Sequence, residues 1–277
     1  MTPGLGFRGE VVDFYHRYRH GYPPSVIDAL VAAFTLTRAD TVVDLGCGTG
    51  QLTIPIAHRV HAVVGVDPEP DMLTRARTAA AEQSVANATW VIGTDAELPA
   101  LGRLFGAGSL GAVTIGQALH WMRPDELFRT LFPLVRVGGG VAVVTNGSPL
   151  WLQDTDWSRA LRGWLEGWLD RDLGYACGTD TDSQLRYRAA LSTAGFDVRE
   201  THLRYAAELD LEQLVGGIYS ALPVDQLPPP DQRPRFAEQI RRALHPDQRF
   251  VEHVDVTLLI GIKNQPPGRR RSATSAV

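Results

Sequence analysis

The sequence predicts an α/β protein built on a doubly wound, mostly parallel sheet of seven strands, with a helical cap in its second half. Between Thr41 and Val144, short β-branched runs alternate with turns and with stretches of helical periodicity, which is typical of βαβ units. The runs are apolar along their length, as expected when helices cover both faces of the sheet. The chain has 277 residues, 44% of them hydrophobic, so it can bury the core of one such domain and still supply a cap.

The first five strands are expected at residues 41–45, 61–67, 89–93, 112–116 and 140–145. Crossover helices are expected between them, at residues 51–59, 71–81 and 124–135. Asp71 is a polar start signal for the second helix, and Pro124 suits the first turn of the third, where its missing N–H leaves no partner unsatisfied. These elements begin the main domain, which we place at residues 41–263.

Two amphipathic helices are expected ahead of the sheet, at residues 8–19 and 24–36, so we treat residues 1–40 as an N-terminal unit. Prolines 23 and 24 separate the two helices, because proline forces the preceding residue out of helical geometry. Behind the fifth strand, residues 151–173 predict a helix with four tryptophans and several leucines at helical spacings. We expect this helix and the following loop to form a cap over about residues 151–182.

The rest of the chain predicts two strands and three more helices. The strands are expected at residues 196–209 and 253–262, and the helices at residues 183–194, 210–220 and 235–244. A proline-rich loop spans residues 223–234. The tail, residues 264–277, is rich in proline, arginine and serine and is expected to be disordered, with its three consecutive arginines solvated.

Composition argues against several classes of function. The formal net charge is -4 and the pI about 6.1, so the overall field gives no reason to expect nucleic acid or an anionic membrane as a partner. Cys47 and Cys177 are far apart and predict neither a disulfide nor a zinc site. Nothing resembles a leader or reaches the roughly 18 apolar residues of a membrane span, so we expect a cytoplasmic protein without a metal. The sequence does not indicate an oligomeric state.

The strongest chemical signal runs from Val42 to Gly50 and reads V-V-D-L-G-C-G-T-G. An apolar strand leads into three alternating glycines, so the backbone can turn tightly and approach a ligand with no Cβ atom in the way. Sheets that bind nicotinamide dinucleotides usually carry G-x-G-x-x-G, with a pyrophosphate in the turn. The glycine spacing and Asp44, which would repel a pyrophosphate, argue against a nicotinamide-dependent oxidoreductase.

Acidic residues after the first two strands indicate what the turn binds. Asp44 would attract the ammonium group of an amino-acid moiety by Coulomb interaction. Asp67 ends the second predicted strand, where the acid of a nucleotide site accepts hydrogen bonds from the ribose hydroxyls. The glycine turn and the two acids together favour a nucleoside that carries a cationic group.

The order of these motifs resembles the class I S-adenosylmethionine-dependent methyltransferases, and within them the small-molecule methyltransferases of the family 11 type. The resemblance covers roughly residues 8–144. The family's first motif is close to V-L-D-x-G-C-G-x-G, which residues 43–50 match from its second position onward, and its glycine turn before the fifth strand is similar to residues 136–140. The resemblance implies a Rossmann-like sheet with an antiparallel last strand, S-adenosyl-L-methionine as the cofactor and S-adenosyl-L-homocysteine as the product.

The resemblance also implies roles for single residues. Asp67 would bind the ribose, Met72 would lie along the adenine, and Asp95 would accept from the adenine amino group. Residues 114–121 are similar to the family's segment beside the methyl group, where many members carry His-Trp, as His120 and Trp121 do here. The implied cofactor residues are Tyr15, Arg19, Asp44, Gly46, Cys47, Gly48, Gly50, Asp67, Pro68, Met72, Asp95, Ala96 and Gln117.

The N-terminal segment is similar to a Y-x-x-x-R-P-x-Y-P run that closes over the cofactor in some members. It spans residues 15–23, and His20 stands where that run has proline. The candidate acceptor contacts are Tyr22, which lies in a turn, together with His120, Trp121 and Trp151.

Structural roles compete with several of these assignments. Asp95 could be a loop acid without a ligand, and a histidine after a strand, such as His120, is often a hydrogen-bonded structural residue. The tryptophans between Trp151 and Trp168, and Trp121, have a spacing that suits either a core face or the lining of a pocket.

Methyl transfer requires the acceptor atom, the methyl carbon and the sulfur on one line, with water excluded. His120 is the candidate general base for a hydroxyl acceptor. A carboxylate acceptor needs no base, so His120 would then position it and Arg19 would pair with it. The fourth strand ends in Gly-Gln-Ala-Leu at residues 116–119, not in the Asn/Asp-Pro-Pro-Tyr/Phe run that resembles enzymes methylating amides or base amino groups.

We therefore expect a small apolar or aromatic metabolite, such as a specialised natural product, as the acceptor, with O-methylation favoured. Carboxylate, N- or C-methylation by the same fold is the alternative. A non-catalytic regulatory protein that binds the cofactor is the alternative from another class, because fold alone does not establish catalysis.

Overall fold

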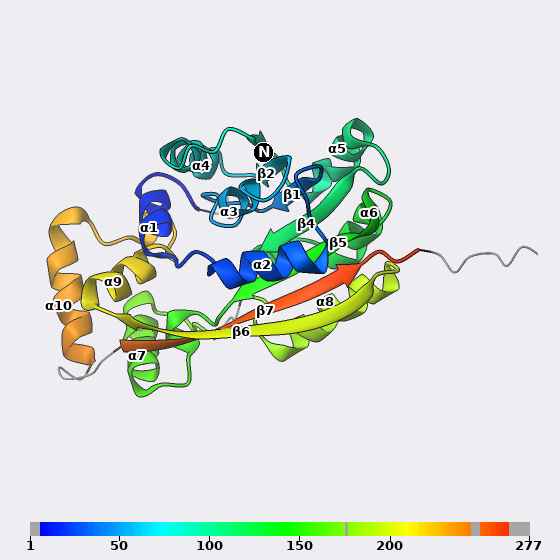
Figure 1. Ribbon diagram of the computed structural model, residues 1–277. Coiled ribbons are helices and arrows are strands. Elements are labelled where there is room, and N and C mark those ends of the chain that lie inside the picture. The colour runs from blue at the N-terminus through cyan, green and yellow to red at the C-terminus, as the bar shows by residue number, and fades with distance from the viewer. Residues whose placement is uncertain (1–5, 175–176, 245–249, 266–277) are drawn as a thin grey trace, which may run out of the picture.

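The computed structural model describes residues 6–174, 177–244 and 250–265. Seven strands form one mixed sheet in the order β3-β2-β1-β4-β5-β7-β6 (Figure 1). Strands β1 to β5 run parallel, and β7 pairs antiparallel with both β5 and β6, which confirms the predicted fold class. The strands are β1 (Thr41–Leu45), β2 (Ala62–Asp67), β3 (Ala88–Ile92), β4 (Leu110–Gly116), β5 (Val135–Asn146), β6 (Asp197–Leu209) and β7 (Phe250–Ile262).

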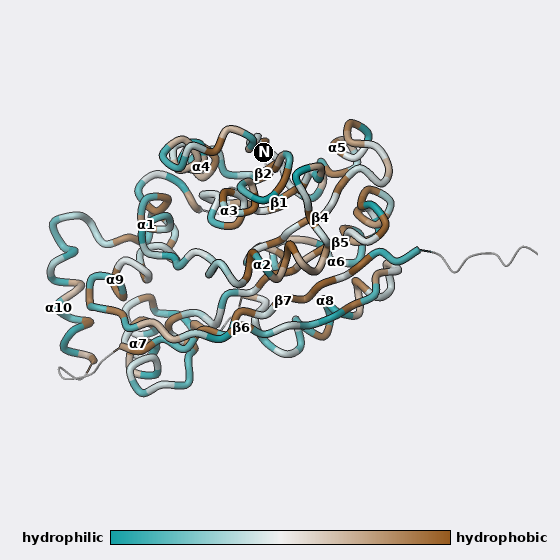
Figure 2. Tube along the Cα trace, viewed as in Figure 1, coloured by the Kyte–Doolittle hydropathy of each residue, from teal (hydrophilic) through white to brown (hydrophobic). Residues whose placement is uncertain are grey.

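Helices cover both faces of the sheet, which is why the central strands are apolar along their length (Figure 2). One face packs against α2 (Pro24–Ala33), α3 (Thr53–Ala57) and α4 (Pro70–Glu82). The opposite face packs against α5 (Leu98–Phe105), α6 (Pro124–Leu131) and α8 (Thr181–Thr193). Alternate residues of a strand divide between the two cores: Val42 contributes to the first and Val43 to the second.

A helical layer stands at one end of the sheet, where α1 (Glu10–Tyr18), α7 (Asp156–Leu169), α9 (Leu211–Tyr219) and α10 (Arg233–Ala243) gather (Figure 1). We call these four helices the cap. Their shared core includes Trp157, Leu161, Ile218 and Phe236, and Phe14 of α1 packs against it. The cap is therefore assembled from three separate parts of the chain, whereas the sequence had predicted a cap from residues 151–182.

The predicted helix over residues 151–173 begins later than expected. Trp151 lies in a short 3-10 turn (Leu150–Leu152), and α7 starts only at Asp156, after the Thr155 hydroxyl has accepted a hydrogen bond from the Ser158 N–H at 3.3 Å. The tryptophans consequently do not share one environment. Trp157 is 2% exposed in the cap core, whereas Trp168 is 38% exposed.

Two further boundaries and one helix also differ from the prediction. Helix α6 ends at Leu131; Phe132 keeps α-helical dihedrals, but Pro133 has no N–H with which to continue the helical hydrogen bonds. Strand β5 begins at Val135, opposite Leu110, and a register shift then precedes Gly140, where we had placed its start. Helix α5 was not predicted at all. Most of the predicted tail, residues 266–277, lies outside the described residues.

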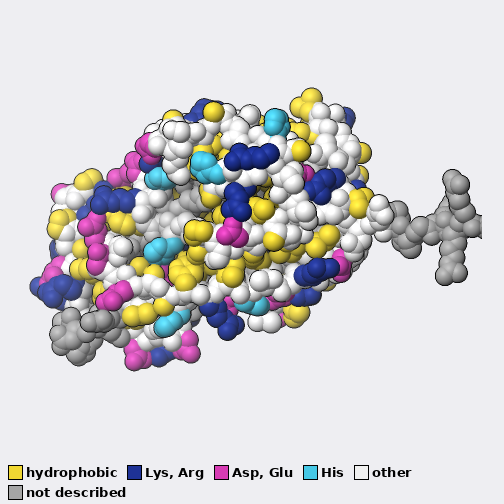
Figure 3. Space-filling view, viewed as in Figure 1, with side chains coloured by type: hydrophobic (Ala, Val, Ile, Leu, Met, Phe, Trp, Pro, Cys, Tyr) yellow, Lys and Arg dark blue, Asp and Glu magenta, His cyan; other side chains and the backbone are white. Residues whose placement is uncertain are grey.

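The surface carries both signs of charge side by side. On the face in Figure 3, basic and acidic side chains are interspersed, particularly at the cap end. Several are paired, such as Arg17 with Glu212 at 2.8 Å. No helix in the described ranges is long and apolar enough to cross a membrane. Those ranges also contain no group of three or more His, Cys, Asp or Glu side chains placed to hold a metal ion.

Candidate cofactor and acceptor site

The glycine turn after β1 adopts the strained geometry that its sequence predicts. Gly46, Gly48 and Gly50 have φ values of 71°, 53° and 84°, a region that favours glycine. A Cβ atom on Gly46 would lie 2.3 Å from the Cβ of Ala118, so the backbone of the turn packs directly against the Ala118 side chain in the loop after β4. The turn therefore forms a shallow cradle at the carboxyl end of the sheet, where ligands of open α/β sheets bind.

Asp44 lies beneath this turn and is 1% exposed. Thr53 of α3 donates to one of its oxygens at 2.5 Å, and Thr114 of β4 donates to the other at 2.8 Å. Burial raises the pKa of Asp44 to about 6 against the lowering effect of both hydroxyls, and the nearby charge of Asp67 raises it further. Each carboxylate oxygen keeps a second lone pair, so the group can still act on a cation above it.

Asp67 ends β2 and is 7% exposed. Its two oxygens accept hydrogen bonds from the backbone N–H groups of Gly48, at 2.8 Å, and Glu69, at 3.0 Å. Burial raises the pKa of Asp67, and these two hydrogen bonds work against the rise. The Gly48 contact joins the ends of β1 and β2, so the second acid also holds the turn in shape.

The other residues expected near the adenine lie around the ends of β2 and β3. Met72 is 3% exposed in the first turns of α4, and Pro68 is partly buried beside Asp67. Asp95 begins a 3-10 turn capped by Thr94, and the only described hydrogen bond to its side chain, from the Arg123 N–H, is 3.5 Å long. Ala96 is exposed. Asp95 is thus barely engaged by the described part of the protein.

Helix α1 covers the turn from the cap side. The Tyr15 ring would lie 3.8 Å from a Cβ atom on Gly48, and the Arg19 guanidinium lies over that ring, 5.4 Å from its centroid. Burial raises the pKa of Tyr15, the charge of Arg19 lowers it, and the nearby carboxylates of Asp67 and Asp44 raise it further. Tyr15 therefore lies against the glycine turn, and Arg19 packs on the Tyr15 ring.

The loop after β4 forms the other wall. Gln117 has a φ of 53°, unusual for a residue with a side chain, and its Oε1 atom is buried without a hydrogen-bond partner among the described residues. His120 follows in a 3-10 turn (Leu119–Trp121), with its ring centroid 4.9 Å from that of Trp121. Burial lowers the pKa of His120 to about 4. Trp121 is 54% exposed.

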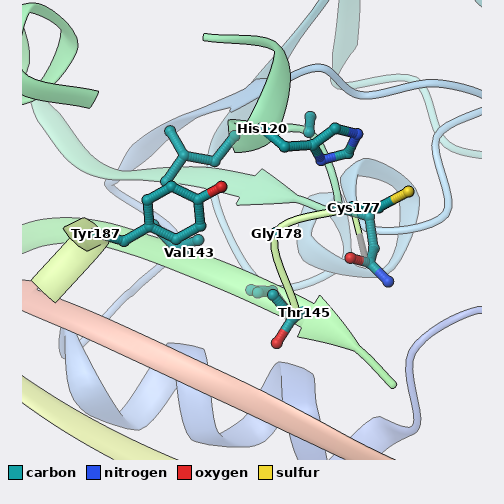
Figure 4. Close-up of a pocket in the computed structure, with 10 residues that line it drawn as sticks. His120, Val143, Thr145, Cys177, Gly178 and Tyr187 are labelled. Carbon is teal, nitrogen blue, oxygen red and sulfur yellow. The ribbon is translucent and has the colours of Figure 1, made fainter. Parts of the chain in front are cut away.

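The segment before α8 closes over His120 (Figure 4). A Cβ atom on Gly178, whose φ is 79°, would lie 2.5 Å from the Tyr187 hydroxyl and 3.3 Å from the His120 Cβ. A cavity of about 10 Å³, the space of one water molecule, lies among these residues and Cys177. Figure 4 shows the His120 ring and the Cys177 thiol pointing to the same side, away from Tyr187.

The candidate acceptor residues lie in three different places. Tyr22 reaches the end of β4, where its hydroxyl would lie 2.7 Å from a Cβ atom on Gly116. His120 stands on the loop after the same strand. Trp121 is largely exposed, and Trp151 packs against the cap core with its Nε1 atom buried and without a partner among the described residues. Tyr22 and His120 are thus brought to one strand end, whereas the structure does not bring Trp151 to them.

Comparison with known proteins identifies the domain. Residues 42–139 match the family model described as a methyltransferase domain. An uncharacterized methyltransferase of Mycobacterium tuberculosis is 36% identical over 174 residues, which cover 63% of this chain and 60% of that protein. A probable S-adenosylmethionine-dependent methyltransferase of Saccharomyces cerevisiae is 28% identical over 128 residues, covering 46% and 43%. The chain contains a class I S-adenosylmethionine-dependent methyltransferase domain.

Solved structures agree with this domain in fold. A putative type II methyltransferase from Anaeromyxobacter dehalogenans has a TM-score of 0.55 at 20% identity, over 89% of this chain and 97% of that one. The match to the mycobacterial relative spans only 60% of its length. The methyl donor of the methyltransferase domain is S-adenosyl-L-methionine, and its product is S-adenosyl-L-homocysteine.

The residues present suit this cofactor. A Cβ atom on Gly48 would meet nothing closer than the Tyr15 ring, at 3.8 Å, so the turn is open there. The two buried acids, Asp44 and Asp67, offer acceptors of the kind that a cationic amino group and a ribose require. The methyltransferase domain also holds buried polar atoms without partners among the described residues, at Thr49 Oγ1 in the turn and Gln117 Oε1 beside it. Such atoms are costly unless something hydrogen-bonds to them, so both favour a polar ligand between the two loops.

Sequence reasoning missed several residues of this site. Thr53 and Thr114, which bond to Asp44, carried no signal beyond their polarity within apolar segments. Gly178 and Tyr187 lie more than 50 residues after His120 and join it only through the packing of α8. Ser220, whose hydroxyl accepts a hydrogen bond from Arg19 Nε at 2.8 Å, comes from the end of α9.

Proposed function

We propose that this chain transfers a methyl group from S-adenosylmethionine to a small apolar or aromatic acceptor, and that oxygen is the favoured acceptor atom. One observation carries the proposal. His120 stands at the end of β4, partly buried beside Gln117, and burial lowers its pKa to about 4, so that the imidazole is neutral at pH 7. A neutral imidazole in that position can accept a hydrogen bond or a proton from an acceptor hydroxyl.

The low basicity of His120 narrows the acceptor class. A base with a pKa near 4 is poorly matched to an aliphatic alcohol, because the proton transfer is then strongly uphill. A phenol or a carboxylic acid holds its proton far less tightly. The low pKa of His120 therefore favours an acidic acceptor, a phenolic hydroxyl above all, and a carboxylate as the alternative.

The cofactor supplies an electrophilic methyl group when bound. We assign its ribose to Asp67, its adenine to the neighbourhood of Met72, Asp95 and Ala96, and its amino-acid end to the turn above Asp44. Tyr15 and Arg19 would cover that end from α1. Pro68, Gln117 and the turn residues Gly46, Cys47, Gly48 and Gly50 would complete the contact surface.

The proposed reaction is a nucleophilic displacement at the methyl carbon, at the end of β4. The acceptor oxygen forms a bond to the methyl carbon while the carbon–sulfur bond breaks, and the sulfur keeps that electron pair. His120 takes the hydroxyl proton, directly or as a hydrogen bond that tightens in the transition state. Tyr22, which reaches the same strand end, would position the acceptor, and the cap would exclude water from it. We assign Trp121 to the entrance of this pocket and Trp151 to the support of the cap.

The carboxylate alternative is favoured by the charge of Arg19. Burial raises the pKa values of Tyr15, over the glycine turn, and of Cys177, beside His120, and the positive charge of Arg19 offsets part of the rise at both residues. A carboxylate placed between these residues would find a cation there without any base being needed. The two alternatives predict different products, a phenyl ether or a methyl ester.

The test is transfer of tritiated methyl groups from labelled cofactor by the purified chain. Labelled small molecules from an extract of aromatic metabolites are expected to enter an organic solvent. Release of volatile label by mild alkali indicates an ester, and stable label indicates an ether. His120→Ala should slow formation of an ether by about 10² to 10⁴ and leave cofactor affinity almost unchanged. Label in nucleic acid or protein would overturn the acceptor class, and tight cofactor binding without any transfer would support a regulatory protein.

A further inference from the structure

The segment between α1 and α2 crosses the carboxyl end of the sheet. We call residues 19–22 the strap. The Arg19 carbonyl accepts from Gln51 Nε2 at 2.8 Å, and the His20 carbonyl accepts from Asn146 Nδ2 at 3.2 Å. Together with the bond from Arg19 to the cap, these contacts tie the strap to the turn before α3 and to the end of β5. The strap also carries Arg19 and Tyr22 into the site.

One ionic contact joins the strap to β7. His20 Nε2 lies 3.1 Å from Glu252 Oε2, and the Glu252 side chain is 8% exposed. The other oxygen of Glu252 accepts from Gln153 Nε2 at 3.0 Å, which fixes the carboxylate in place. No group in the described part of the chain meets hydrogen-bond geometry at Oε2, so this buried oxygen depends on the ionic contact with His20. A buried carboxylate oxygen is strongly stabilised by a cationic partner and costly without one.

The surroundings of the pair are otherwise nearly neutral. Asn146 from β5 and Gln153 from the segment before α7 cannot titrate. Tyr205 from β6 donates to Asn146 Oδ1 at 3.4 Å, and burial and the charge of Glu252 raise its pKa, so it stays neutral. Arg19 is turned toward the cap by its own hydrogen bond. Among these described neighbours, His20 is therefore the group whose charge changes near neutral pH.

We propose that His20 and Glu252 form a latch that holds the strap closed over the cofactor, and that closure takes up one proton on His20. The latch rests on the cofactor site of the proposed function. In the proposed site the cofactor would lie between the glycine turn and Tyr15 of the N-terminal segment, and would leave when that segment moves. His20 is a positioning residue in this scheme: it acts on the site through Arg19 and Tyr22.

The sign of the pH effect follows from the pair. The hydrogen bond to Glu252 raises the pKa of His20, in opposition to its partial burial. Proton binding therefore favours the closed strap, and the latch weakens as the pH rises through that pKa. A hydrogen bond between charged partners is stronger than a neutral one by an amount that corresponds to about a fivefold change in an equilibrium. Release of the cofactor product should accelerate by about that factor between pH 6 and pH 8.

The experiment measures the dissociation rate of S-adenosylhomocysteine by stopped-flow displacement from pH 5.5 to 8.5. The dissociation rate is chosen because the bound ligand keeps Asp44 ionised, so that carboxylate adds no titration of its own. His20→Gln and Glu252→Gln should release the ligand quickly at every pH. His253→Gln is the matched control: His253 neighbours Glu252 on β7 but is exposed, so this variant should keep the wild-type profile.

Several outcomes overturn the latch. A dissociation rate independent of pH in the wild type would do so, as would a pH dependence that persists in His20→Gln. Should Glu252→Gln fail to fold, His20→Gln decides alone, because its side chain is 37% exposed and tolerates a polar replacement. Amide exchange of residues 19–22 without ligand should show the same dependence. Failure to bind S-adenosylhomocysteine at any pH would overturn the proposed function as well. This outcome differs from failure of the latch alone, in which the ligand still binds.

Discussion

Replacing Asp44 with asparagine should stabilise the free protein while weakening its hold on the cofactor. Burial raises the pKa of this carboxyl group from an ordinary 3.8 to about 6, so the charged form is disfavoured in the fold. At 1.36 kcal/mol for each pH unit, that corresponds to about 3 kcal/mol of lost stability once the group is ionised. Asparagine has nearly the same shape and carries no charge.

The pH dependence makes this prediction specific. An acid with a raised pKa in the fold costs nothing where both states are protonated, and the cost grows as the pH rises from about 4 to 6. The gain in stability of Asp44→Asn over wild type should thus be about 3 kcal/mol at pH 8 and about half of that at pH 5. Urea unfolding at the two pH values measures the difference.

Asp40 provides a control at the opposite end of β1. Burial alone would raise its pKa, but hydrogen bonds from Arg136, at 2.6 Å, and from Thr37 outweigh this effect and hold the pKa below its ordinary value. Its stabilising contribution is present at neutral pH and is lost as the pH falls, so Asp40→Asn should be most destabilised at pH 8. If Asp44→Asn shows the same trend as Asp40→Asn, the reasoning about the buried carboxylate is refuted.

Cofactor binding by the Asp44 variant completes the test. Loss of one charged partner of the cofactor ammonium group should raise the dissociation constant of S-adenosylhomocysteine by roughly tenfold to a hundredfold, measured by calorimetry at pH 7.5. Equal affinity would show that Asp44 does not act on the cofactor.

The remaining predictions concern other single residues. Asp67→Asn should weaken S-adenosylhomocysteine binding by about 1–3 kcal/mol, because it removes an acceptor from the ribose and from one backbone N–H; unchanged affinity in calorimetry would contradict this. Gly216→Ala places a Cβ atom 2.3 Å from the Tyr18 ring, so it should lower stability by about 1–3 kcal/mol and loosen α1, whereas Gly163→Ala, which meets nothing, should add about 0.5–1 kcal/mol. Tyr219→Phe should leave thermal stability equal or higher, because the buried hydroxyl has no partner among the described residues; a clear loss would reveal one.

The parts of the site that the sequence predicted are those formed within a few residues. The glycine turn, Asp44 and Asp67 follow directly from strands whose apolar pattern is visible, and parallel strands bring their carboxyl ends together. Nothing more than the order of elements was needed to place them. The fold class followed from the same alternation of strands and helices.

The parts that could not be predicted depend on contacts between distant segments. The cap combines α1 with helices from two later parts of the chain, and no local pattern states that Phe14 would join the same core as Phe236. The latch is similar: His20 differs from the run that the segment resembles, but its partner lies 232 residues away on β7. Some element boundaries also differ from the prediction because a side chain caps the helix terminus or a proline ends the helix. Thr155, for example, sets the start of α7 by accepting a hydrogen bond from the Ser158 N–H.

The two buried acids connect stability with binding in this domain. Asp44 and Asp67 both have raised pKa values, so each is destabilising in the free protein when ionised. A bound cation would stabilise the ionised form of Asp44 and so remove its destabilising effect. Ribose hydroxyls would stabilise the charged form of Asp67 by hydrogen bonding. The ligand should therefore raise the melting temperature more at pH 8 than at pH 5, beyond the mass-action effect at equal saturation. Because the latch weakens above pH 6, the stabilisation that the ligand gives and the rate of its release should both be greater at pH 8 than at pH 5, a combination that a single titrating group would not produce.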